Sequence, residues 1–221
     1  MSAANSGAGP AFRPRFRAIL LLGSFDPDTR ALLEKSQALL AKTTLALEWP
    51  TMALLVDGFE IYTGISSTSG AAMYFIVESG ERSAAHIVEG SEWIDSVPLP
   101  ADQPDLEEAV TSLARQRFDA SVKKLPILEK LRVLSAGEPL TFLVRDKELT
   151  RGGEYIELAF ILGLGTERTR NRMWFMHRQL VPISKMAEEI LDMYGVASRT
   201  YATENELLER IARITLYQAD R

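Results

Sequence analysis

The chain has 221 residues, of which 46% are hydrophobic and 25% are charged, and its formal net charge is −5. This composition is typical of a globular protein with a sizeable core, and the scattered basic residues of an acidic chain argue against general nucleic-acid binding. Cysteine is absent and only two histidines occur, which excludes disulfides and thiolate metal sites and disfavours a Ser-His-Asp triad or a histidine-rich metal centre.

The first 16 residues are small and polar, and they include proline and glycine. Because they lack the apolar core of a secretory signal, we expect residues 1–16 to be a disordered leader in a cytoplasmic protein. The longest apolar run, residues 71–77, is too short to cross a bilayer, so no membrane partner is expected. Residues 17–221 are expected to form a single domain.

A strand, a loop and a helix open this domain. The apolar run at residues 18–22 predicts a buried strand, and the sequence Gly-Ser-Phe-Asp at residues 23–26 follows it. Asp26 or Asp28 is placed to cap a helix over residues 27–41, with a proline in its first turn. Such a unit is typical of α/β folds.

The next region changes character, because short apolar runs are joined by tight turns. An Asp-Gly pair at residues 57–58 lies between two such runs and predicts a β-hairpin over residues 52–62. A second hairpin is predicted over residues 72–88. We therefore expect an antiparallel insertion at about residues 44–98 within an α/β core.

Helical and strand-like patterns alternate over the rest of the chain. The predicted helices cover residues 104–118, 127–134, 184–193 and 204–216, and a further helix starts at residue 153; the predicted strands cover residues 140–144, 172–177 and 199–202. This order favours a Rossmann-like or flavodoxin-like three-layer α/β sandwich with an antiparallel β-hairpin insertion.

The segment at residues 150–164 is the strongest indication of a site. Gly152 and Gly153 follow a predicted strand and open an apolar helix with two acids, Glu154 and Glu157, near its start. The free N–H groups at a helix N-terminus favour a bound phosphate or sugar, and a carboxylate there can attack an anomeric carbon or stabilise the sugar cation. The alternative is that both acids are first-turn residues favoured by the helix dipole.

The same residues resemble a known family. The stretch from Gly153 to Glu157 resembles the Gly-x-x-x-Glu segment of nucleoside 2-deoxyribosyltransferases, in which the glutamate is the nucleophile. The turn at residues 23–25 is similar to the turn that opens that family. The related Toll/interleukin-receptor domains also place a catalytic glutamate early in a helix, and some of them cleave NAD. The resemblance covers the first strand–helix unit and residues 137–215, and it implies that Glu157 is the nucleophile.

The chain departs from the transferase pattern at one position. The family has an aspartate two residues before its glycine, where this chain has Arg151, and Asp146 is the candidate replacement. The predicted catalytic residue is Glu157. The predicted substrate-binding residues are Gly23, Ser24, Phe25, Asp26, Asp146, Gly152, Gly153 and Glu154.

Three functions are consistent with this pattern. The first is a nucleotide- or nucleoside-processing enzyme that cleaves or transfers an N-glycosidic bond, with a small-molecule partner, no metal and no cofactor. The second is a noncatalytic nucleotide-sensing or protein-interaction module on the same fold. The third, a metal-dependent hydrolase, would need the acids Asp146, Glu148 and Glu154 to cluster.

His177, at the end of a predicted strand, is expected to be structural rather than ligand-binding. Assembly into homo-oligomers is left open.

Overall fold

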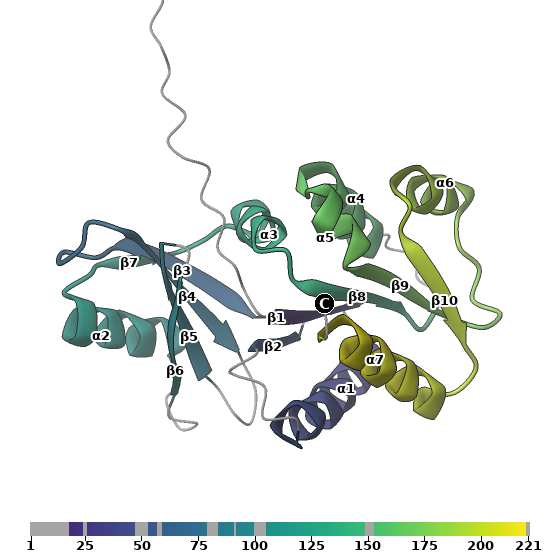
Figure 1. The fold of residues 1–221 in the computed structure, drawn as a ribbon, viewed down its shortest axis with the longest axis horizontal. Coiled ribbons are helices and arrows are strands. Elements are labelled where there is room, and N and C mark those ends of the chain that lie inside the picture. The colour runs from purple at the N-terminus through teal and green to yellow at the C-terminus, as the bar shows by residue number, and fades with distance from the viewer. Residues whose placement is uncertain are drawn as a thin grey trace, which may run out of the picture.

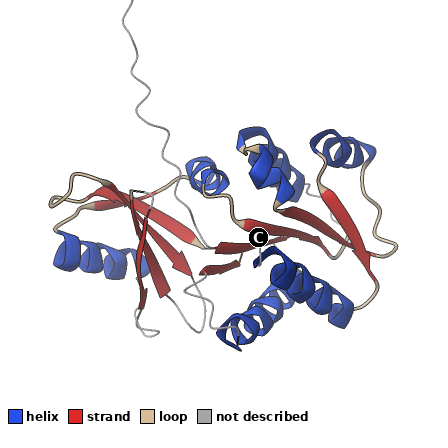
Figure 2. Ribbon diagram, in the orientation of Figure 1, coloured by secondary structure: helices blue, strands red, loops and turns tan. Residues whose placement is uncertain are grey.

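The computed structural model describes residues 18–23, 26–46, 53–56, 59–78, 84–90, 92–99, 105–148 and 153–219, and its architecture is α/β (Figures 1 and 2). Five parallel strands form one sheet in the spatial order β10-β9-β8-β1-β2. These strands are β1 (Ala18–Gly23), β2 (Ala53–Val56), β8 (Leu140–Arg145), β9 (Met173–Arg178) and β10 (Ala197–Tyr201).

The second sheet is antiparallel and has the order β6-β5-β4-β3-β7. Its strands are β3 (Glu60–Ile65), β4 (Ala72–Glu78), β5 (Ala84–Glu89), β6 (Glu92–Pro98) and β7 (Val122–Lys124). The described helices are α1 (Pro27–Ala46), α2 (Leu106–Phe118), α3 (Ile127–Ala136), α4 (Gly153–Leu164), α5 (Glu167–Asn171), α6 (Lys185–Tyr194) and α7 (Glu204–Ala219).

Helices cover both faces of the parallel sheet, which makes three layers. In Figure 1, α1 and α7 lie on one side of the sheet, and α3, α4 and α6 lie on the other. Successive residues of β1 point to opposite faces, so Ile19 and Leu21 pack with α1 and α7 while Leu20 and Leu22 pack with α3 and α4. This double burial explains why β1 is an unbroken apolar run, and it confirms the predicted sandwich class.

The antiparallel sheet lies beside β2 and β1 in Figure 1 and has α2 against one face. The buried Val110 and Ala114 of α2 pack on Phe75 and Val77 of β4. On the other face, Ile76 joins the core cluster that contains residues of β1 and α3. One continuous apolar core therefore connects the two sheets.

The strand order reverses direction at β1. The chain passes from β1 through α1 to β2 on one side, and it returns after the antiparallel sheet to place β8 on the other side of β1. If only the parallel strands are numbered, this is the flavodoxin-like order 2-1-3-4-5. Such a reversal opens a crevice outside the carboxyl ends of the two strands, which is where open α/β sheets bind ligands.

One predicted hairpin is wrong. The run before the Asp-Gly pair is β2, which pairs in parallel with β1, whereas β3 after the pair belongs to the antiparallel sheet. The two runs have the alternation and the turn residues that are typical of a hairpin. In the structure, however, β2 pairs with β1, which lies 35 residues earlier in the chain, and Ala53 is in register with Ala18. The second hairpin, β4 with β5, is confirmed.

The antiparallel region also has different limits from those expected. Its strands run from β3 to β7, at residues 60–124, because β7 adds to β3 after α2. Residues 44–52, at the start of the expected insertion, belong to the end of α1 and to a stretch outside the described residues. The expected leader, residues 1–16, also lies outside the described residues.

Candidate functional site at the carboxyl edge of the parallel sheet

The strand reversal places the expected crevice beyond Gly23, where β1 ends. Gly23 is in register with Val144, and a Cβ atom at Gly23 would lie 2.9 Å from the Cγ2 of Thr29 and 3.2 Å from the carbonyl oxygen of Val144. A side chain at Gly23 would thus collide with α1 and with the backbone of β8. Ser24 and Phe25, which were predicted to bind substrate, lie outside the described residues.

Asp26 caps α1, as the sequence predicts. Its carboxylate accepts the backbone N–H of Asp28 at 3.1 Å and that of Thr29 at 3.0 Å, and it accepts the Thr29 hydroxyl at 2.5 Å. Thr29 itself is fully buried. Capping and this buried hydroxyl therefore occupy much of the hydrogen-bonding capacity of Asp26.

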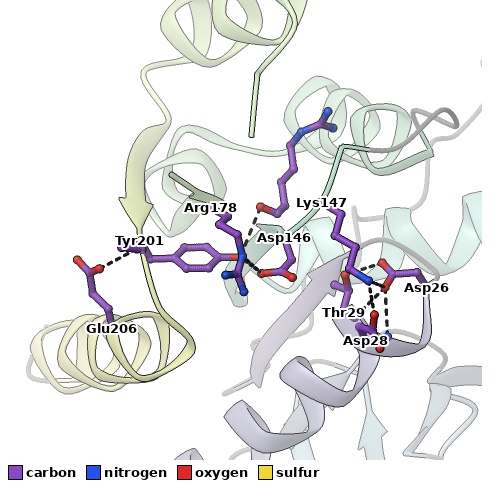
Figure 3. Close-up of polar contacts among 10 residues, drawn as sticks. Asp26, Asp28, Thr29, Asp146, Lys147, Arg178, Tyr201 and Glu206 are labelled. Carbon is purple, nitrogen blue, oxygen red and sulfur yellow. Dashed lines mark hydrogen bonds and ion pairs between the residues drawn. The ribbon is translucent and has the colours of Figure 1, made fainter. Parts of the chain in front are cut away.

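A lysine bridges the crevice. Lys147 follows β8, and its Nζ lies 3.5 Å from Oδ1 of Asp26 and forms an ion pair with Asp28 in the first turn of α1 (Figure 3). The hydrogen bond to Asp28 is the main reason that the pKa of Lys147 is raised. Both sides of the bridge are partly solvent-exposed, so a competing anion can reach the ammonium group.

Asp146 anchors a buried network on the α1 and α7 side of the sheet. Its Oδ1 accepts hydrogen bonds from Nε of Arg178 and from the hydroxyl of Tyr201, each at 2.8 Å. These bonds join the ends of β8, β9 and β10 (Figure 3). Burial first, and then the hydrogen bond to Asp146, raise the pKa of Tyr201 well above its ordinary value. Asp146 was predicted to bind substrate, and the structure commits its carboxylate to Arg178 and Tyr201.

A second group lies on the opposite face of the same strand ends. Arg145 of β8 is in register with His177 of β9, and the guanidinium of Arg145 lies 4.9 Å from the ring centre of Tyr155 in the first turn of α4. Nδ1 of His177 is buried and has no hydrogen-bond partner among the described residues. Burial and the charge of Arg145 both lower the pKa of His177, which keeps the imidazole neutral at pH 7.

The predicted catalytic segment reaches this edge. α4 begins at Gly153, one of the two glycines that were predicted to open it, and Glu157 lies one turn into the helix. The helix is held against the sheet by Leu158, Ile161 and Leu162, which are buried in the core. Gly152, and the side chains of Glu154 and Glu157, lie outside the described residues.

Sequence reasoning missed most of the cationic groups. Arg145, Lys147 and Arg178 were not among the candidates, and His177 was assigned a structural role. Each occupies one of the last positions of a buried strand or the first positions after it. A polar residue at the end of an otherwise apolar strand was the signal that could have found them.

Two further properties concern metals and membranes. Within the described ranges, no group of three or more His, Asp or Glu side chains is arranged to hold a metal ion. No helix in the same ranges is long and apolar enough to cross a bilayer.

Comparisons of this chain with family models, with curated proteins and with solved structures give no match. Function must therefore be argued from the site itself. The described carboxylates nearest the crevice, Asp26 and Asp146, are both held by donors from the protein. Lys147, Arg145 and the neutral His177 give this edge a donor-rich character that suits an anionic or highly hydroxylated ligand.

Proposed function

We propose that the carboxyl edge of the parallel sheet binds a nucleotide or nucleoside, and that the protein cleaves or transfers its N-glycosidic bond with Glu157 as the acting carboxylate. The observation that supports this most directly is the strand reversal at β1, because α1 and α4 start on either side of the crevice between β1 and β8. Glu157 lies one turn into one of these two helices.

Lys147 supports the binding step. A phosphate entering the crevice would replace Asp26 and Asp28 as the partner of the Lys147 ammonium, and it would lie near the N-terminus of α1. A neutral His177 can accept or donate a hydrogen bond to a sugar hydroxyl or a base without adding charge. These groups would orient the ligand across the edge toward α4.

The chemistry falls to Glu157 because the chain lacks cysteine and because Asp26 and Asp146 are already engaged. In the proposed reaction, the Glu157 carboxylate attacks the anomeric carbon and the carbon–nitrogen bond breaks. The bonding electron pair leaves with the base; a purine or pyrimidine then takes a proton from solvent, whereas the nicotinamide of NAD leaves as a neutral molecule. Water or a second base then displaces the glutamate, releasing the free sugar or a new nucleoside.

The test is incubation of the protein with NAD and, separately, with each of the four 2′-deoxynucleosides, followed by chromatography of the released bases. We expect a free base from at least one of these substrates, and a loss of roughly a hundredfold or more in rate for Glu157→Gln. Glu167→Gln is the matched control, because Glu167 is an exposed first-turn acid of the next helix, α5. Equal rates for wild type and Glu157→Gln would contradict the assignment.

A noncatalytic nucleotide sensor is the second candidate. It is favoured by the ion pairs and hydrogen bonds that already occupy Asp26 and Asp146, since a sensor needs donors for the ligand and no free carboxylate. It predicts that NAD or a nucleoside raises the melting temperature while no base is released. In that case Glu157→Gln would leave the thermal shift unchanged.

A further inference from the structure

A cavity lies along the outer strand β10, two strands away from β8 in the parallel sheet. Its volume is about 360 Å³, and it opens between β10 and α7, which run alongside one another in Figure 1. The cavity is lined by Arg199, Glu206, Glu209, Arg210, Arg213 and Ile214. Three guanidinium groups from two elements therefore face one hollow, and the proposed N-glycosidic chemistry uses none of them.

The charges in this cavity do not cancel within the protein. Glu206 accepts two hydrogen bonds from the protein, one from Nη2 of Arg210 at 2.5 Å and one from the backbone N–H of Ala202 at 2.7 Å. That backbone hydrogen bond, followed by the one from Arg210, lowers the pKa of Glu206 and keeps it ionised. Within the described ranges, neither Arg199 nor Arg213 has a carboxylate within ion-pair distance.

Arg199 is held in place before any ligand arrives. Its guanidinium lies 5.4 Å from the ring centre of Trp174 of β9, and its Nη1 donates to the carbonyl oxygen of Ser198 at 2.9 Å. Stacking on an indole fixes the plane of a guanidinium and leaves most of its N–H groups available for another acceptor. Arg210 and Arg213 are three residues apart on α7, so they share one flank of the helix.

We propose that this cavity binds the phosphate group of a small-molecule ligand. A phosphate dianion can accept from Arg199 and Arg213 together, and planar guanidinium groups bind phosphate oxygens in pairs of parallel hydrogen bonds. The volume is at the lower end of the range for small-ligand sites, which suits a phosphorylated metabolite rather than a macromolecule. The net charge of −5 likewise disfavours a nucleic acid.

The test uses inorganic pyrophosphate as the probe and the full-length chain, at constant ionic strength. Binding is followed by the indole N–H resonance of Trp174 in ¹H–¹⁵N spectra, assigned by its absence in Trp174→Phe. We expect this resonance to shift in a saturable manner. The double variant Arg199→Gln/Arg213→Gln should weaken binding at least about tenfold, and Glu209→Gln should tighten it, because a carboxylate that repels the anion is removed from the lining.

Arg115→Gln is the matched control, since Arg115 is an exposed arginine on α2 and is not among the residues that line this cavity. It should bind pyrophosphate like the wild type. Absence of a saturable Trp174 shift would overturn the proposal. Equal weakening in the Arg115→Gln control and in the double variant would also overturn it, because the binding would then follow net charge. Loss of the base-release activity in Glu157→Gln leaves these measurements unaffected, so the two proposals fail independently.

Discussion

Carboxylates of the two sheets differ in how far they are buried. All six residues of β1 and of β8 are buried, and the side chain of Asp146, which directly follows β8, is only 9% exposed. In the antiparallel sheet, Asp95 of β6 pairs with Arg117 while 40% of the Asp95 side chain remains exposed. Helices cover both faces of the parallel sheet, and Asp146 is withdrawn from water and held by Arg178 and Tyr201, whereas water competes with Arg117 for Asp95.

This comparison predicts its largest effect at Asp146. Asp146→Ala would leave Arg178 without its carboxylate and Tyr201 without its main acceptor, and we expect the free energy of unfolding to fall by about 3 kcal/mol. Asp95→Ala, the counterpart in the other sheet, should destabilise the protein much less, because its ion pair with Arg117 is solvent-exposed. Urea denaturation of both variants measures the difference, and equal losses would remove the distinction between the sheets.

Gly23 tests the close packing at the crevice. Gly23→Ala should destabilise the protein by about 1–3 kcal/mol, because the new methyl group meets Thr29 and a carbonyl oxygen of β8. Gly163→Ala in α4 is the matched control, since apart from its own helix no described residue comes within 4 Å of a Cβ there, and it should stabilise the helix by up to about 1 kcal/mol. Thermal denaturation measures both effects. An unchanged melting temperature for Gly23→Ala would show that Thr29 and the backbone of β8 can shift to make room for the methyl group.

Tyrosine hydroxyls allow the same comparison on a smaller scale. Tyr201→Phe removes the hydrogen bond to Asp146 and should cost about 1 kcal/mol. Tyr62→Phe removes a hydrogen bond of 2.6 Å to Glu60 of β3, and it should cost less because Glu60 keeps its ion pair with Lys124. Denaturation curves that gave the larger loss for Tyr62→Phe would contradict this ranking.

The smallest expected effect is the pH dependence of His177. Its pKa in the folded protein lies below the ordinary 6.5, so the unfolded chain binds the proton more readily. The stability contributed by the neutral imidazole is therefore present above pH 6.5 and is lost as the pH falls below 6.5 toward the folded pKa. Arg145→Gln should raise the pKa of His177, as followed by imidazole carbon resonances, and an unchanged pKa would rule out a contribution from the Arg145 charge.

The local elements of this fold follow from the sequence, because their signals are local. The cap at Asp26 lies where the sequence predicts it, and α6 agrees with the helix predicted over residues 184–193 to within one residue at each end. The partner of β2 does not follow from local signals, since an Asp-Gly turn and parallel pairing with a distant strand are both compatible with one short apolar run. Strand pairing depends on packing between remote segments, which a single sequence does not display.

The candidate site shows the same limit. Gly23, Asp26 and the start of α4 could be predicted from a strand-turn-helix pattern. The pairing of Arg145 with His177 could not, because it depends on the register between β8 and β9. The two hydrogen bonds that Asp146 accepts, from Arg178 and from Tyr201, join residues more than 30 positions apart, so this network could not be predicted from local patterns either.

The central claim is that a nucleotide or nucleoside binds where β1 and β8 end, and backbone amide spectra recorded during titration with NAD and with 2′-deoxynucleosides test it most directly. We expect saturable shifts for Gly23, Lys147 and Tyr155, which surround the crevice, and none for Thr63 and Val88 of the antiparallel sheet. No shift with any of these ligands, or shifts confined to the antiparallel sheet, would contradict the account.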